Sequence, residues 1–75
     1  MVHFTNITFD EDWVYADAYD SDNNVSGKVK INRATEQFYT NCKYENLFHK
    51  AFLHVLVDVE DGKVKQNSER TVAWG

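Results

Sequence analysis

The groups best suited to chemistry are a cysteine, a glutamate and a histidine that are spaced for one face of a helix. Cys42, Glu45 and His49 are three and four residues apart, and such a set can bind a metal ion or activate a thiol. Cys42 and His49 would be two turns apart, however, roughly 10 Å by helical rise, which one ion cannot bridge directly. The sequence places no base or orienting group beside the thiol. We therefore expect a partly buried Cys42 near a capped helix start, and no catalytic residue.

The histidines are not spaced as metal ligands. His49 and His54 are five residues apart, so on a helix they would point about 140° away from each other. His3 is too remote in sequence to be placed beside them. A single cysteine cannot form an internal disulfide. The sequence therefore predicts no metal site and no cofactor.

Two acidic stretches resemble functional motifs only in part. The D-x-D-x-N pattern at 20–24 matches the first half of a calcium loop, but Val25 and Ile31 occupy the positions that need glycine and a bidentate glutamate. The acids at 10–12 could act as paired carboxylates, as in glycosidases. A chain of 75 residues has little room for a cleft of about 300 Å³. Both stretches are therefore predicted to be turns, and the protein is not expected to be an enzyme.

Length and charge limit the classes of function. A chain of 75 residues allows one compact domain over 1–75, and a domain of this size buries only about 60% of its unfolded surface. Twelve acids and eight bases give a net charge of −4, which argues against general binding to a phosphate backbone. We find no signal peptide pattern and no run of the ~18–20 apolar residues that a membrane helix needs. We therefore expect a cytoplasmic location and no membrane contact.

The element that must position these groups is a helix predicted from Asn41 to Gly62. Thr40 or Asn41 can cap its start, and Gly62 stands where a left-handed C-terminal residue belongs. The apolar residues that follow the spacing of one helix face are Tyr44, Leu47, Phe48, Ala51, Phe52, Val55, Leu56 and Val59.

The second half of this segment has an alternative interpretation. Leu53, Val55, Val57 and Val59 alternate with polar residues as a strand would. We favour the helix because an uninterrupted apolar stretch of this length is rarely one strand. Leu53 and Val57 then fall beside the main apolar face and widen it, which predicts an association surface there.

The remaining segments have strand patterns separated by turn residues. The chain is therefore predicted to be an α+β protein, with a three- to five-stranded, mainly antiparallel sheet and one long helix packed on one face. The strands before the helix form a meander, and a C-terminal strand returns to the sheet. The predicted strands are Val2–Phe9, Trp13–Tyr19, Val25–Asn32, Gln37–Thr40 and Arg70–Trp74.

The strand at 13–19 has one small face and one aromatic face. Val14, Ala16 and Ala18 suit close contact with a helix, whereas the opposite face is either a second core layer or a partly exposed patch. Aromatic sheet faces occur in protein interfaces and can also stack single-stranded RNA. The aromatic residues that could share this face are Trp13, Tyr15, Tyr19, Phe38, Tyr39 and Trp74. The nearby bases are only Lys28, Lys30 and Arg33, so nucleic acid is an unfavoured ligand.

Short motifs give a resemblance over most of the chain. They are F-T-N-I at 4–7 with Ala-Asp at 16–17, G-K-V-K-I-N at 27–32 with a turn at Thr35, and R-T-V-A-W-G at 70–75. Together they resemble a group of small, uncharacterised proteins from Gram-positive bacteria. A helical segment with His49 or His54, Ala51 and Leu56 is also similar to that group. The resemblance implies a bacterial, intracellular and compact protein, and it carries over no functional residue.

These observations favour a non-enzymatic protein-interaction or regulatory module, including self-association as a homodimer. The alternative is a small-ligand or metal-binding protein that uses Cys42, His49 and His54. A weaker alternative is a single-stranded nucleic acid binder. The predicted interface residues are Trp13, Tyr15, Tyr19, Leu53 and Val57.

Overall fold

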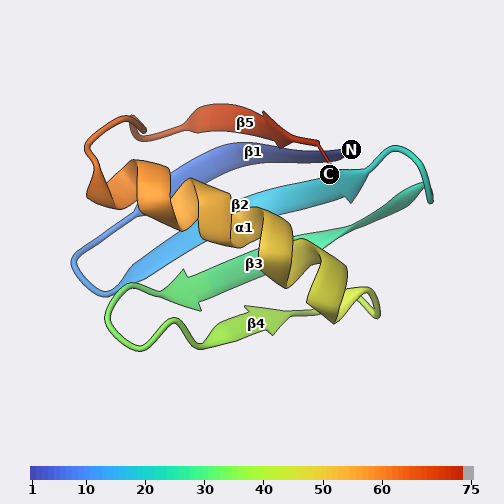
Figure 1. The fold of residues 1–75 in the computed structure, drawn as a ribbon, viewed down its shortest axis with the longest axis horizontal. Coiled ribbons are helices and arrows are strands. Elements are labelled where there is room, and N and C mark those ends of the chain that lie inside the picture. The colour runs from blue at the N-terminus through green and yellow to red at the C-terminus, as the bar shows by residue number, and fades with distance from the viewer. Residues whose placement is uncertain (74–75) are drawn as a thin grey trace.

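A computed structural model describes residues 1–73 of the chain. These residues form a five-stranded antiparallel sheet with strand order β4-β3-β2-β1-β5 and one helix, α1, that lies across one face (Figure 1). The predicted α+β fold is therefore confirmed, including the meander and the returning C-terminal strand. The elements are β1 (Val2–Phe9), β2 (Trp13–Asp20), β3 (Val25–Asn32), β4 (Phe38–Thr40), α1 (Glu45–Glu60) and β5 (Ser68–Val72).

Strand β2 turns its small residues toward the helix, as the alternation predicts. Ala16 and Ala18 are only 6% and 3% exposed. Small residues in the middle of a sheet leave space beneath a helix, and phenyl rings fill it here. Phe52 of α1 lies between Phe4 of β1 and Phe38 of β4, with ring centroids 4.9 and 6.3 Å away. A line of aromatic rings therefore crosses the helix-facing side of β2 and β3 within a core that is otherwise mainly aliphatic.

Strand β1 contains a β-bulge, although it has no glycine, the residue that often marks such a bulge in a sequence. Its pairing with β2 shifts between Thr5 and Thr8, and its pairing with β5 shifts between Phe4 and Ile7. Asn6 takes the extra position with φ of +51°, a left-handed conformation that asparagine tolerates better than most residues. The inserted residue reverses the alternation, so that Ile7 joins Phe4 in the core.

The helix begins at Glu45 rather than at Asn41, so the predicted caps are wrong. The N-cap residue is Tyr44, which makes no side-chain capping bond. Thr40 Oγ1 instead donates to the Lys28 carbonyl at 2.7 Å, and Asn41 Oδ1 accepts from the Lys28 N–H at 2.9 Å. These two side chains continue the pairing of β3 beyond the end of β4, which leaves neither free to cap the helix.

The end of the helix is as predicted. Gly62 has φ of +73°, its N–H donates to the Val59 carbonyl at 3.0 Å, and the Lys63 N–H donates to the Asp58 carbonyl at 2.8 Å. This pair of bonds is the Schellman arrangement that closes a helix at glycine. Because the helix runs without interruption to Glu60, the strand interpretation of 53–59 is excluded.

Strand β5 begins at Ser68, two residues before the predicted start, and pairs antiparallel with β1. The preceding loop is tied to the sheet through Gln66, whose amide accepts from the Phe9 N–H at 3.0 Å and donates to the Phe9 carbonyl at 2.7 Å. Val64 is buried in the core. Trp74, predicted to end this strand, lies outside the described residues. No helix in the described part of the chain is long and apolar enough to cross a membrane.

Candidate interaction surface

The side of the sheet opposite α1 carries a band of exposed rings. We call it the free sheet face, because within residues 1–73 the only helix lies on the other side (Figure 1). Tyr15, Tyr19 and Tyr39 are 38%, 40% and 49% exposed, and Trp13 is half-buried. Of the two interpretations of this face, the structure shows a partly exposed patch. Its main residues are His3, Trp13, Tyr15, Asp17, Tyr19, Lys28, Lys30 and Tyr39.

A lysine joins the rings of β2 and β4. Strand pairing places Lys30 directly between Tyr15 and Tyr39. Its ammonium lies 4.8 Å from the ring centroid of Trp13 and 5.5 Å from that of Tyr39, and the two rings are 5.9 Å apart. A cation–π contact at an exposed site contributes about 0.5–1 kcal/mol. The contacts therefore restrict these side chains before any partner binds.

The polar centre of the free sheet face is Asp17. Its carboxylate accepts from Asn6 Nδ2 at 2.9 Å and from Lys28 Nζ at 2.9 Å. The hydrogen bond from Asn6, followed by that from Lys28, lowers the pKa of Asp17 below its ordinary value. The carboxylate is thus ionised at neutral pH, and its charge is balanced by Lys28. The bulge in β1 brings Asn6 to this position.

A shallow hollow of about 610 Å³ lies over this centre. Rings from two strands, Tyr15 and Tyr39, line it together with the Asn6–Asp17–Lys28 network and Lys30. Ligand sites in proteins occupy about 300–1,000 Å³. The free sheet face is therefore recessed in the middle, where its charged groups meet.

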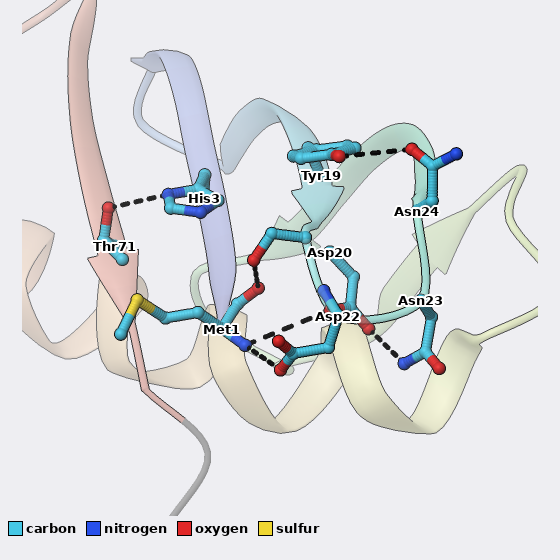
Figure 2. A network of polar contacts seen from close by, with 9 residues as sticks. Met1, His3, Tyr19, Asp20, Asp22, Asn23, Asn24 and Thr71 are labelled. Carbon is cyan, nitrogen blue, oxygen red and sulfur yellow. Dashed lines mark hydrogen bonds and ion pairs between the residues drawn. The ribbon is translucent and has the colours of Figure 1, made fainter.

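A second group of contacts fixes the far end of the face (Figure 2). The His3 ring stacks on Tyr19, with centroids 6.1 Å apart and planes 22° from parallel. His3 Nδ1 lies 3.0 Å from Thr71 Oγ1 of β5, and the Tyr19 hydroxyl donates to Asn24 Oδ1 at 3.1 Å. Tyr19 is thus exposed but held on both sides.

The acidic turn after β2 is closed by its own side chains (Figure 2). Asp20 is fully buried and accepts from Asn23 Nδ2 at 2.6 Å and from the Asp22 N–H at 3.0 Å. The Met1 ammonium lies 4.0 Å from Asp20 and 2.6 Å from Asp22. The hydrogen bond from Asn23 is the main cause of a lowered pKa at Asp20. This geometry is a hairpin turn, as the sequence predicts.

Cys42, Glu45 and His49 do not share a helical face, because Cys42 precedes the helix. The half-buried Cys42 Sγ accepts from the Tyr44 N–H at 3.5 Å. His49 stacks on Phe38, with centroids 4.8 Å apart, and His54 is exposed. Within residues 1–73, no group of three or more His, Cys, Asp or Glu side chains is arranged to hold a metal ion.

The predicted interface residues fall on two separate surfaces. Trp13, Tyr15 and Tyr19 lie on the free sheet face. Leu53 is partly buried against the core, whereas Val57 is 57% exposed on the outer side of α1. Phe38, one of the residues that could have shared the aromatic face, packs toward the helix instead, because it pairs with the core residue Ile31.

Sequence reasoning missed two contributors to the free sheet face. His3 reaches it through β1, and Asn6 reaches it through the bulge. An asparagine inside an apolar strand is the one signal that could have indicated the bulge, because asparagine adopts positive φ more readily than most residues. The contact of His3 with Tyr19 depends on strand register, which the sequence pattern leaves open.

Comparisons with protein-family models, curated proteins and solved structures found no match to this chain. The resemblance to small proteins of Gram-positive bacteria therefore stays a prediction. The chemistry and exposure of the free sheet face are the basis for a functional proposal.

Proposed function

We propose that this protein is a non-enzymatic interaction module that binds another protein chain, a second copy included, through the free sheet face. The observation that carries the proposal is the exposure of Tyr15, Tyr19 and Tyr39 on a sheet face that no described element covers. Aromatic residues are enriched in the centres of protein interfaces, where they bury large areas. A regulatory role would act through the same contact.

The rings on this face are held in place, which favours binding. Lys30 contacts Trp13 and Tyr39, and His3 stacks on Tyr19. Ordering a mobile side chain at an interface costs about 0.5–1.5 kcal/mol. Side chains that already have one arrangement lose less freedom when a partner docks.

The polar groups of the face favour recognition over catalysis. Asp17 is ionised and bonded to Asn6 and Lys28, so it has no proton to donate as a general acid. Lys28 forms an ion pair with Asp17, and the ammonium of Lys30 lies over the rings of Trp13 and Tyr39. These engagements, with a net charge of −4, also disfavour a nucleic acid backbone as the ligand.

A small-ligand function is the second candidate, and the hollow in the free sheet face supports a location different from the one that the sequence suggested. The hollow of about 610 Å³ beside Tyr15 and Tyr39 has the size of a ligand site. The sequence predicted such a function from Cys42, His49 and His54. These residues do not form one site, because Cys42 precedes α1, His49 stacks on Phe38 and His54 is exposed. A ligand would therefore occupy the free sheet face, where it would compete with a protein partner.

The proposal is tested by photo-crosslinking in cells that produce the protein. A benzophenone-bearing amino acid is placed at Tyr15, at Val57 on the outer helix surface, or at Lys50, an exposed helix position. We expect a discrete crosslinked protein from the Tyr15 position and none from Lys50. Crosslinks from Val57 alone would move the interface to the helix, and an absence of crosslinks from all positions would contradict the proposal.

A further inference from the structure

We infer that the partner of the free sheet face is a second copy of this chain, packed face to face as a twofold dimer. The inference rests on the proposed function and specifies its partner. Three features of the described residues support it: the area of the face, the distribution of its charges and the recess at its centre.

The outline of the molecule is large enough to contain a dimer interface at the small end of the specific range. The molecule measures 31 × 21 × 20 Å, and the view down its shortest axis looks onto the sheet (Figure 1). This 31 × 21 Å outline limits the face to roughly 650 Å² per copy, so two copies would bury at most about 1,300 Å², near the lower end of the ~1,200–2,000 Å² of specific interfaces. A dimer would also cover the side of the sheet that α1 leaves open, which is a common way to stabilise a small domain.

The charges of the face favour a copy of itself over a strongly charged partner. Lys28 and Lys30 stand on β3, whereas Asp17 stands on β2. Glu69 joins them on β5, because Thr71 pairs with His3 and a residue two positions away points to the same side. The four charges cancel, although the whole chain carries −4.

Opposite charges on separate strands make the surface self-complementary. A twofold interface uses the same patch on both copies, so Lys30 of one copy can meet Glu69 of the other and the reverse, while Asp17 and Lys28 stay paired within each copy. A polyanion would leave the two acids of the face unmatched, and a very basic protein would leave the two lysines unmatched. Charge balance thus favours self-association.

The recess at the centre suits sheet packing. Stacked sheets lie about 10 Å apart and interdigitate their side chains. The hollow of about 610 Å³ between Tyr15 and Tyr39 gives room for rings of the second copy. Closing it would desolvate the Asp17–Lys28 pair, a cost that their mutual attraction and the hydrogen bond from Asn6 partly offset.

Sedimentation equilibrium from about 1 µM to about 1 mM, a range that detects micromolar to millimolar dimers, tests the inference. We expect the mass of the native chain to rise from monomer to dimer. The double variant Tyr15→Thr/Tyr39→Thr, which places residues with good strand propensity at both positions, should weaken association at least about tenfold, or 1.4 kcal/mol. Val57→Thr on the outer helix surface is the matched control and should leave it unchanged.

A dilution series of ¹⁵N-resolved NMR spectra on the native chain avoids any effect of substitution on folding. Amide shifts that change with concentration should cluster on β2 and β3. A monomer mass at every concentration, or shifts confined to α1, would overturn the inference. With a monomer mass, a crosslinked heterologous protein from position 15 would leave the proposed function standing, whereas no crosslink would overturn both.

Discussion

Asp20 is a fully buried acid that supports the turn between β2 and β3. Its pKa is lowered, chiefly by the hydrogen bond from Asn23, and burial opposes this effect. An aspartate in an unfolded chain has a pKa of about 3.9. A lower pKa in the folded state means that this group stabilises the fold above about pH 4–5, and that the stabilisation is lost as the pH falls through the folded-state pKa.

We therefore expect Asp20→Asn to reduce the free energy of unfolding at neutral pH and to reduce its loss on acidification. Urea unfolding at about pH 7, 5 and 3 measures both effects. Glu11→Gln is the matched control, because Glu11 is exposed and makes no side-chain hydrogen bond or ion pair within residues 1–73. Equal pH dependence in the two variants would contradict the role given to Asp20.

Gly27 is required by the close approach of the segment that follows β4. A Cβ atom at this position would lie 2.8 Å from Asn41 Oδ1 and 2.9 Å from Cys42 Cβ. We expect Gly27→Ala to lower the free energy of unfolding by about 1–3 kcal/mol, the usual cost of an overpacked site. Ser26→Ala on the neighbouring exposed position should change it by less than about 0.5 kcal/mol. Chemical unfolding compares them, and equal effects would remove the steric explanation.

The start of α1 depends on contacts outside the helix. Asn41 accepts from the Lys28 N–H, so it supports the middle of β3 instead of the first helical turn. We expect Asn41→Ala to cost about 1 kcal/mol and to speed hydrogen exchange at the Lys28 amide, without changing exchange at Phe48 in the helix. Asn41→Asp keeps the acceptor and should restore protection at Lys28. Faster exchange at the Phe48 amide alone would indicate that Asn41 caps α1.

Arg33 joins two turns to the end of α1. Its Nε donates to Glu60 at 2.7 Å, and its guanidinium also donates to the Asp10 carbonyl at 2.5 Å. The pair raises the pKa of Arg33 and lowers that of Glu60. Because Glu60 is half-exposed, we expect solvent screening to leave only a small coupling between the two side chains. A double-mutant cycle with Arg33→Ala and Glu60→Gln measures this coupling. A coupling of zero would mean that the Arg33 side chain contributes only through its hydrogen bond to the Asp10 carbonyl.

These elements show which structural features a sequence pattern can predict. Alternation in β2 and β3 is local, so their two faces and the burial of Ala16 and Ala18 were predictable. The bulge at Asn6 and the helix start at Glu45 were not, because each depends on a partner far along the chain. For the candidate site, the rings of β2 were predictable. Their exposure was not, because a pattern cannot say whether a second layer covers a sheet face.

At the scale of the molecule, residues 1–73 form a single sheet with one face covered by α1, and this arrangement relates stability to concentration. A chain of 75 residues has a small core, and binding to the native state stabilises it by mass action. If a second copy covers the free sheet face, the melting temperature must rise with protein concentration. For a domain of 60–100 residues, about 1 kcal/mol corresponds to roughly 4–8 °C.

We expect the melting temperature of the native chain to increase by several degrees over a hundredfold rise in concentration, since such a rise is worth about 1.4 kcal/mol per chain once dimers predominate. Differential scanning calorimetry at both concentrations measures this shift. Tyr15→Thr/Tyr39→Thr removes two exposed rings of the free sheet face and should abolish most of the shift in melting temperature. Val57→Thr should retain the shift. A native melting temperature that is independent of concentration would show that the sheet is stable with one face open to solvent, and it would contradict the dimer.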